Sequence, residues 1–160
     1  MQDQSTEILA TAQASAPRRW MGIGMLALLG GLLIYVAFVT PPATIGWQVF
    51  LLILGAASLY LAEKMRRATE LVIQLSVNGL HDDTGAVIAA LDEIAAVSRG
   101  TFAMKPSNGF TLRLNAGGAR AWQPGVYWRW GRRVGIGGVL PGSQTKFMAE
   151  MLEAMLAQRG

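Results

Sequence analysis

The pattern of apolar positions along this chain is dominated by one long stretch. From Trp20 to Ala62 there is no Lys, Arg, Asp or Glu at any of 43 consecutive positions. At about 1.5 Å of rise per residue, a helix of roughly 20 residues matches the roughly 30 Å hydrocarbon core of a bilayer. We therefore predict transmembrane helices over residues 20–39 and 45–62. The turn between them contains two prolines, which cannot continue a helix, so the helices form an antiparallel hairpin.

The charges beside this stretch predict its orientation. Two arginines precede the first helix and three cations follow the second, whereas the connecting turn has none. Because cytoplasmic loops of membrane proteins are enriched in Lys and Arg, we expect a multi-pass protein of the cytoplasmic (inner) membrane with both termini cytoplasmic. Aromatic rings near the helix ends favour the headgroup zone. The predicted membrane-flanking anchors are Arg18, Arg19, Trp20, Trp47, Lys64, Arg66 and Arg67.

Two alternatives accompany the hairpin. A secretory signal peptide also starts with basic residues and an apolar run, but here the run is too long, no small-residue cleavage site follows it and a second span comes next. Small residues four positions apart, Ala27 with Gly31 and Ser58 with Ala62, allow helices to approach closely. We expect them to pack within the hairpin, and pairing with another protein's helix is the alternative.

The segments outside the hairpin differ in character. Residues 1–19 are polar and alanine-rich, and Pro17 is expected to interrupt any helix before the first span, so we predict a flexible cytoplasmic tail. Residues 63–160 are enough for one small cytoplasmic domain. Short runs of strand formers separated by turn signals predict a β-rich domain there.

Individual elements of that domain can be placed. Residues 71–77 are rich in β-branched side chains and lead into Asn78-Gly79, a strong hairpin signal, and residues 110–114 alternate as a half-buried strand does. Residues 86–98 fit either one helix or two strands around a short turn, because periodicity does not separate the two. A terminal helix is predicted over residues 143–158, with Ser143 as its N-cap.

The order of these elements resembles a known family. "SVNGLHDDTGAVIAALDEIAAV" is followed by "GFTLRLNAGGARAW", by "GRRVGIGG" and by the terminal amphipathic helix. This order is similar to that of the bacterial pleckstrin-homology-like (PH-like) domains found beside transmembrane helices. The resemblance implies an α+β membrane protein, in which a curved antiparallel sheet of about seven strands is closed by the last helix. It also implies strands over residues 86–98, and a binding or scaffolding module that acts through lipid or protein contacts.

Catalytic chemistry has little support in the sequence. The chain has no cysteine and one histidine, His81, beside Asp82 and Asp83, and no second His completes a metal-ligand set. Asp92 and Glu93 are adjacent, whereas paired catalytic carboxylates face each other across a cleft. The glycines of residues 135–138 lack the Lys of a phosphate-binding loop. We predict no enzymatic activity, no cofactor and no metal.

Charge is segregated within the predicted domain. Residues 68–98 contain five acidic residues and no Lys or Arg, whereas residues 99–149 contain eight basic residues and no acidic one. Aromatic residues and arginines interleave in the basic half and form a candidate lipid or protein contact. These residues are Arg120, Trp122, Tyr127, Trp128, Arg129, Trp130, Arg132 and Arg133. The alternative is that alternate aromatic rings face the core and the arginines are ordinary solvated positions.

These observations lead to a functional hypothesis. We expect a non-enzymatic, membrane-anchored binding or scaffold module that contacts anionic lipid headgroups or a membrane protein complex. The alternative is an accessory or assembly subunit of a transporter or of a respiratory or photosynthetic complex, acting through its transmembrane hairpin. Membrane lipids and another membrane protein are the expected partners, and the chain can also form a homo-oligomer. Nucleic acid is not an expected partner, because no recognition helix or RNA-binding strand motif is visible.

Overall fold

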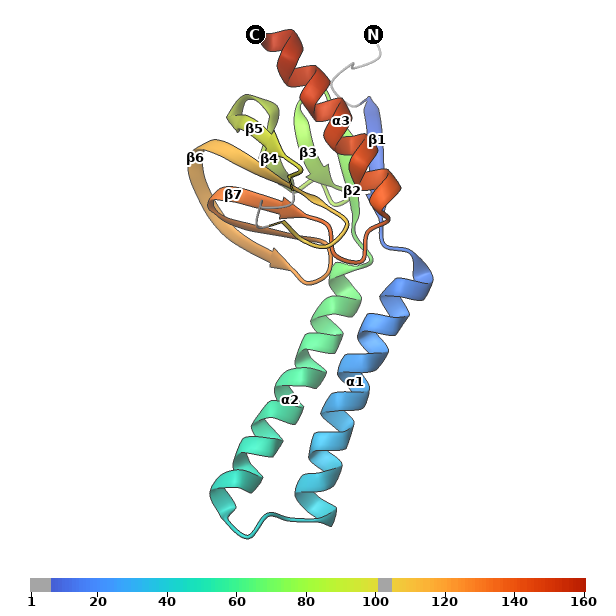
Figure 1. Cartoon of the computed structure of the whole chain (residues 1–160), viewed down its shortest axis with the longest axis vertical. Coiled ribbons are helices and arrows are strands. Elements are labelled where there is room, and N and C mark those ends of the chain that lie inside the picture. Colours follow the sequence, from blue (N-terminus) through green and yellow to red (C-terminus); the bar gives the residue numbers. More distant parts are fainter. Residues whose placement is uncertain (1–6, 101–104) are drawn as a thin grey trace. The chain divides into compact units, whose positions relative to one another are not determined.

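The structure is a computed structural model that describes residues 7–100 and 105–160 (Figure 1). The chain divides into two compact units. One unit, the helical hairpin, is Ala16–Arg67. The other, the β domain, combines the segment that ends at Ser15 with the segment from Ala68 onward. The β domain is therefore built from both sides of the hairpin, and not from residues 63–160 alone.

Two helices make up the hairpin. Helix α1 is Ala16–Val39 and α2 is Ile45–Ala68, and within the described residues these are the two helices long and apolar enough to cross a membrane. Helix α1 begins four residues earlier than expected. Pro17 lies in its first turn, where the missing N–H of proline costs no hydrogen bond, so this proline starts the helix and does not interrupt it. Helix α2 continues beyond Ala62 through the basic residues.

Glycines bring the two helices together. A Cβ on Gly30 would lie 2.9 Å from the carbonyl oxygen of Gly55, so neither position has room for a larger side chain. Ser58 and Ala62 are buried, as expected for packing within the hairpin, whereas Ala27 and Gly31 are exposed on the other side of α1. The amide of Gln48 donates to the carbonyl oxygen of Ala37 at 2.9 Å, which satisfies one of the free carbonyls at the end of α1.

The outer faces of the hairpin are strongly apolar. Leu28 and Ile45 are 74% and 78% exposed, and they belong to a long row of exposed large apolar residues on α1 and α2. A soluble monomer rarely exposes so large an apolar surface. The hairpin therefore has the surface expected of helices that face lipid.

The first sheet contains the largest departure from the sequence-based expectation. Its strands, in spatial order, are β1 (Ile8–Gln13), β2 (Val72–Ser76), β3 (Gly79–Asp82) and β4 (Val87–Ala90). Strand β1 pairs antiparallel with β2 over five residues, although the whole hairpin separates them in the chain. The prediction of a flexible tail over residues 1–19 is therefore wrong for β1, and residues 1–6 lie outside the described part.

The second sheet begins within residues 86–98, the segment for which periodicity allowed either a helix or two strands. Strands β5 (Ile94–Ser98), β6 (Phe110–Gln123) and β7 (Tyr127–Ile136) form an antiparallel sheet in that order. The 3₁₀ turn η2 (Leu91–Glu93) separates β4 from β5, so residues 86–98 are two strands around a turn. The two described sheets are not closed into one barrel, which corrects the barrel expected from the sequence.

Helix α3 (Gly142–Arg159) covers the core of the β domain (Figure 1). It packs against β1, β5 and β6, and its Met148 and Leu152 are fully buried. The terminal helix was predicted within one residue of its observed bounds. Its predicted N-cap is wrong, because Pro141 occupies that position and makes no side-chain cap, and Ser143 lies inside the first turn.

Candidate contact surface on strands β6 and β7

Strands β6 and β7 form a hairpin that bows outward in its middle. The strands pair at both ends, from Phe110 with Ile136 to Gln123 with Tyr127, but β6 has 14 residues and β7 has 10. The extra residues of β6 shift the register on both sides of the Gly118–Gly131 pair. Such bulges bend a strand, and Figure 1 shows β6 as a long curved arc.

Both ends of this bowed hairpin are held by the rest of the β domain. Phe110 and Leu112 are buried in the core at one end, and Val126 is buried at the other. The carbonyl oxygens of Gly125 and Val126 accept hydrogen bonds of 2.9 Å from the backbone N–H groups of Val139 and Gly137. The turn between β6 and β7 is thus hydrogen-bonded to the residues that follow β7. The middle of the β6–β7 hairpin is left exposed to solvent.

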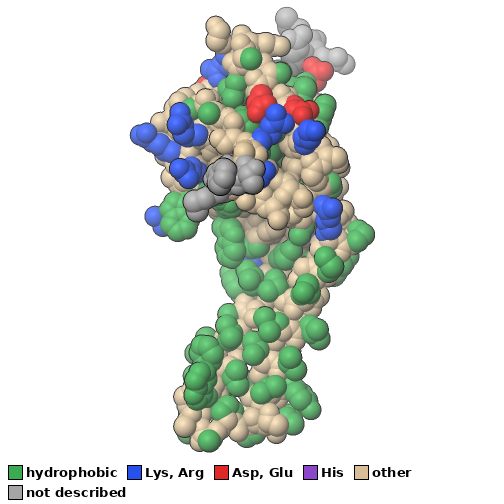
Figure 2. All heavy atoms as spheres, in the orientation of Figure 1, with side chains coloured by type: hydrophobic (Ala, Val, Ile, Leu, Met, Phe, Trp, Pro, Cys, Tyr) green, Lys and Arg blue, Asp and Glu red, His purple; other side chains and the backbone are tan. Residues whose placement is uncertain are grey.

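The middle of the hairpin exposes arginines and tryptophans together. Trp122 is 52% and Trp130 is 67% exposed, and the guanidinium of Arg120 lies 4.9 Å from the centre of the Trp130 ring. We call the exposed set the β6–β7 surface. It consists of Arg113, Arg120, Trp122, Trp130, Arg132 and Arg133. Figure 2 shows basic side chains gathered over the part of the β domain where these strands lie.

Arg113 is a member of this surface that sequence reasoning missed. It lies directly opposite Arg133 in the β6–β7 register, so two exposed cations point to the same face of the sheet. Its other cross-strand neighbour is Ala96 of β5. Arg113 lies nine residues before Trp122, so it fell outside the cluster of arginines and aromatic residues seen in the sequence. The pairing of β6 with β7 places it beside Arg133.

A groove lies within the same hairpin. It has a volume of about 450 Å³. Its lining residues are Arg120, Ala121, Trp122, Trp128, Arg129 and Trp130. The groove is open to solvent and is walled mainly by indole rings and the aliphatic parts of arginines, so it suits an amphipathic ligand better than a small polar one.

Three of the eight candidate residues are buried or only partly exposed. Tyr127 is buried, and desolvation together with nearby Asp82 raises the pKa of its phenol. Trp128 is half-buried and packs against Gly135, where no side chain would fit. Arg129 is only 14% exposed. The structure therefore brings Arg120, Trp122, Trp130, Arg132 and Arg133 to the surface and uses the other three in the fold.

Arg129 joins the two sheets. Its Nη1 donates to the carbonyl oxygen of Ile88 on β4 at 3.0 Å, and its Nη2 lies 3.7 Å from the carboxylate of Glu93 on η2. The simple alternation considered in the sequence, with aromatic rings inward and arginines outward, is reversed at Arg129 and Trp130. The positive φ of Gly131 accompanies this local change of direction.

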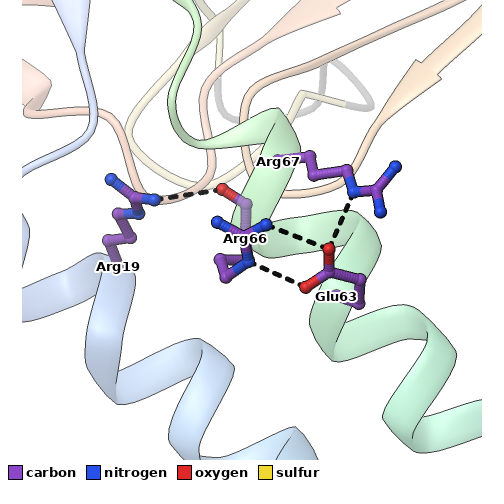
Figure 3. Close-up of polar contacts among 4 residues, drawn as sticks. All are labelled: Arg19, Glu63, Arg66 and Arg67. Atoms are coloured by element: carbon purple, nitrogen blue, oxygen red, sulfur yellow. Dashed lines mark hydrogen bonds and ion pairs between the residues drawn. The ribbon is translucent and has the colours of Figure 1, made fainter.

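Three of the predicted membrane-flanking residues, Arg19, Arg66 and Arg67, cluster with Glu63 at the open end of the helical hairpin (Figure 3). Glu63 of α2 pairs with the guanidinium groups of Arg66 and Arg67, each at 2.7 Å, and Arg19 of α1 donates to the carbonyl oxygen of Arg66 at 3.2 Å. The guanidinium of Arg19 also lies 5.5 Å from the ring of Trp20. The remaining predicted anchors are Arg18 and Lys64 near this end, and Trp47, which is 62% exposed near the start of α2.

Three of the carboxylates considered for metal or acid–base chemistry, those of Asp82, Asp83 and Glu93, have structural roles. Asp82 is buried, and its Oδ1 accepts from the backbone N–H groups of Thr84 and Ala86 at 3.0 and 2.9 Å, so this carboxylate stabilises a turn. Asp83 accepts from the N–H of Val72, and Glu93 pairs with Arg129. In the described part of the chain, no group of three or more His, Cys, Asp or Glu side chains converges as a metal site would require.

Comparison with protein-family models, with curated proteins and with solved structures finds no match to this chain.

Proposed function

We propose that this protein is a non-enzymatic binding module anchored in the cytoplasmic membrane by a two-helix hairpin. One observation carries the proposal: β1, which precedes the hairpin, pairs with β2, which follows it. Two strands can pair only when they lie on the same side of a membrane. The hairpin must therefore return the chain to the side on which it began, as two crossings do.

The charge distribution supports the cytoplasmic side. The cations Arg18 and Arg19 precede the apolar part of α1, and Lys64, Arg66 and Arg67 follow that of α2, whereas the Thr40–Thr44 turn carries no charge. Short basic flanks are retained in the cytoplasm. The β domain, with β1 included, is then cytoplasmic, and so is the chain before it.

The finer fold assignment is also a proposal. The described part of the β domain holds seven strands in antiparallel pairs, and a terminal helix packs against β1, β5 and β6. This arrangement supports a PH-like domain, for which a curved sheet of about seven strands and a closing last helix are expected. The hairpin would then be an insertion between the first two strands of that domain.

The proposed activity is contact rather than catalysis. The β6–β7 surface combines cations with exposed indole rings, which suits anionic lipid headgroups or a binding site on a membrane protein complex. The chain would act as a scaffold, or as an assembly factor, that holds this surface at the membrane.

A second role is favoured by one feature of α1. Ala27 and Gly31 lie outside the hairpin's own packing, and a Cβ on Gly31 would meet no atom within 4 Å. Small residues on a lipid-facing side allow another helix to approach. The chain could thus serve as an accessory or assembly subunit of a transporter or of a respiratory or photosynthetic complex. Purification in mild detergent tests this role: a stoichiometric large partner supports it, and a lone small oligomer contradicts it.

Sided labelling tests the anchor. The chain has no cysteine, so a single introduced cysteine is the only thiol. Ala43→Cys in the hairpin turn and Gln158→Cys in α3 are compared in intact cells with a thiol reagent that does not cross membranes. We expect Ala43→Cys to react at once and Gln158→Cys to react only after permeabilisation. Reaction of Gln158→Cys in intact cells would exclude the proposed topology.

A further inference from the structure

We propose that the β6–β7 surface docks on anionic phospholipid of the membrane that holds the helical hairpin. This inference rests on the proposed anchoring and adds the ligand class and the residues that bind it. The first argument is an unfavourable pair: Arg113 and Arg133 lie directly opposite each other on adjacent strands, and like charges in that position destabilise a sheet. A phosphate bound between them would relieve this repulsion.

Within residues 7–100 and 105–160, no carboxylate is placed to relieve this repulsion. Among the described residues, none of Arg113, Arg132 and Arg133 has a carboxylate within ion-pair distance, whereas Arg99 pairs with Glu150 and Glu153 on α3. The segment that contains the β6–β7 surface has no acidic residue at all from Arg99 to Ala149. The surface is therefore complementary to an anion that comes from outside the chain.

The tryptophans indicate what kind of anion. Trp122 and Trp130 are more than half exposed, and an indole ring with one polar group is best accommodated at the headgroup level of a bilayer. Arg120 stacks on Trp130, so a cation and an apolar ring are presented together. Free phosphate would use the arginines alone, but a phospholipid uses the arginines and the rings.

Connectivity favours lipid over an acidic protein. Two residues separate β1 from α1, and three residues separate α2 from β2. With the hairpin inserted, these short connections confine the β domain to the neighbourhood of the bilayer, where anionic headgroups are the most abundant anions. An acidic protein would have to reach the same surface in competition with them.

The β6–β7 hairpin, which carries the β6–β7 surface, is fixed to the rest of the β domain. Arg129 fastens β7 to β4 and η2, Trp128 packs on Gly135, and the tip hydrogen-bonds beside the exit of β7. The exposed side chains therefore project from a backbone fixed at both ends, so little ordering is needed on binding.

The experiment uses the full chain in lipid nanodiscs, with one nitroxide-labelled cysteine per protein. The label sites are Ala119→Cys in the exposed middle of β6, Gln158→Cys at the end of α3, and Leu28→Cys on the exposed face in the middle of α1. Water and oxygen accessibility of each nitroxide is measured by electron paramagnetic resonance. Discs of phosphatidylcholine alone are compared with discs containing phosphatidylglycerol, at 0.15 M and 1 M salt.

We expect the label at position 119 to lose water accessibility in phosphatidylglycerol discs only, and to regain it at 1 M salt, where the Debye length falls to about 3 Å. The label at position 158 should stay in water in every disc. Arg133→Gln should shift the docking equilibrium about fivefold toward the free state, from the typical contribution of one cation near an anionic surface. Lys146→Gln, an exposed cation on α3, should shift it less than twofold.

One further measurement separates binding from folding. Because Arg133→Gln removes a like-charge pair, its midpoint of thermal unfolding in phosphatidylcholine discs should equal or exceed that of the parent protein. A variant that docks less but is no less stable supports a ligand contact and not a structural role.

The outcomes distinguish the docking from the anchor. A label at position 119 that is equally water-exposed in both kinds of disc overturns the docking, and a label at position 28 that is shielded from water in the same discs supports the anchor independently. If the label at position 28 is also in water, the anchor itself is wrong. Immobilisation at position 119 that is independent of lipid charge and salt would also overturn the proposal and would favour a protein contact.

Discussion

At the scale of single residues, the β6–β7 hairpin depends on positions where the backbone leaves no room. Gly135 faces the ring of Trp128 so closely that a Cβ could not be placed without moving the indole. Gly117, on the neighbouring strand, has only ordinary contacts, since its Cβ would lie 3.9 Å from the nearest atom of Gly131. The two glycines therefore form a matched pair for substitution.

We predict that Gly135→Ala lowers the free energy of unfolding of the β domain by about 1–3 kcal/mol, because overpacking forces the Trp128 ring out of place. Gly117→Ala should change it by less than about 0.5 kcal/mol, as is usual for exposed positions. Denaturant titration followed by tryptophan fluorescence measures both. Equal effects of the two substitutions would show that Trp128 does not pack on Gly135 as described.

Arg129 is the second residue whose role the structure defines. Replacing it with Met removes the hydrogen bond to Ile88 and the ion pair with Glu93, so we expect a loss of about 1.5–3 kcal/mol. Arg132→Met removes an exposed cation and should cost less than about 0.5 kcal/mol. The same titration compares them. The assignment of Arg129 as the link between the sheets fails if Arg129→Met is as stable as Arg132→Met.

At the scale of elements, the helical hairpin was predictable from the sequence and strand β1 was not. The two helices long and apolar enough to cross a membrane were predictable, because a stretch of that length without charged residues is visible in the sequence without any tertiary information. The strands within residues 86–98 were not predictable from local periodicity, because the same pattern fits a helix equally well. The arginines and tryptophans of the candidate contact were predictable from composition. Which of them are exposed depends on the register of β6 and β7, which composition does not give.

Strand β1 was out of reach for a different reason. Its inward positions are Ala10 and Ala12, which have too little apolar surface to mark a strand by alternation, and its partner β2 begins 59 positions after β1 ends. Only the assembled core, in which both alanines are buried beneath α3 and the sheet, makes this segment a strand. The sequence pattern of residues 8–13 alone therefore does not indicate that this segment pairs with β2.

The role of β1 can be tested within the strand. Ala12 is fully buried and Thr11 is exposed, so Ala12→Asp places a carboxylate in the core while Thr11→Asp places one in solvent. We expect Ala12→Asp to destabilise the β domain by more than about 3 kcal/mol, and Thr11→Asp to be nearly neutral. Limited proteolysis of the full chain in lipid nanodiscs reports this difference. Equal protease resistance would mean that β1 is not part of the folded domain.

A second pair of substitutions tests how α1 packs against α2 in the helical hairpin. A Cβ on Gly30 meets backbone and side-chain atoms of α2 at 2.8–2.9 Å, whereas one on Gly31 meets nothing within 4 Å. Gly30→Ala should therefore push the helices apart and reduce the rate of disulfide formation between cysteines placed in α1 and α2. Gly31→Ala should leave that rate unchanged, and a reversed order would contradict the helix interface described here.

At the scale of the whole molecule, the helical hairpin and the β domain are two compact units, and the chain passes between them twice. The hairpin does not precede the domain as a separable leader; it joins two neighbouring strands of one sheet. A fragment that starts after the hairpin lacks β1, and so lacks part of the surface on which α3 packs. Deletion of the first 15 residues should therefore destabilise the β domain even though the remaining chain still contains both α1 and α2.

The pairing of β1 with β2 across the hairpin is the claim on which the topology depends. Thr11 and Gln74 are directly opposite in the register, at a separation that a disulfide can span. Thr11→Cys with Gln74→Cys should form an intramolecular disulfide when isolated membranes are oxidised, and Thr11→Cys with Arg132→Cys should not. If the first pair fails to cross-link while each thiol is labelled from a different side of the membrane, the account is wrong.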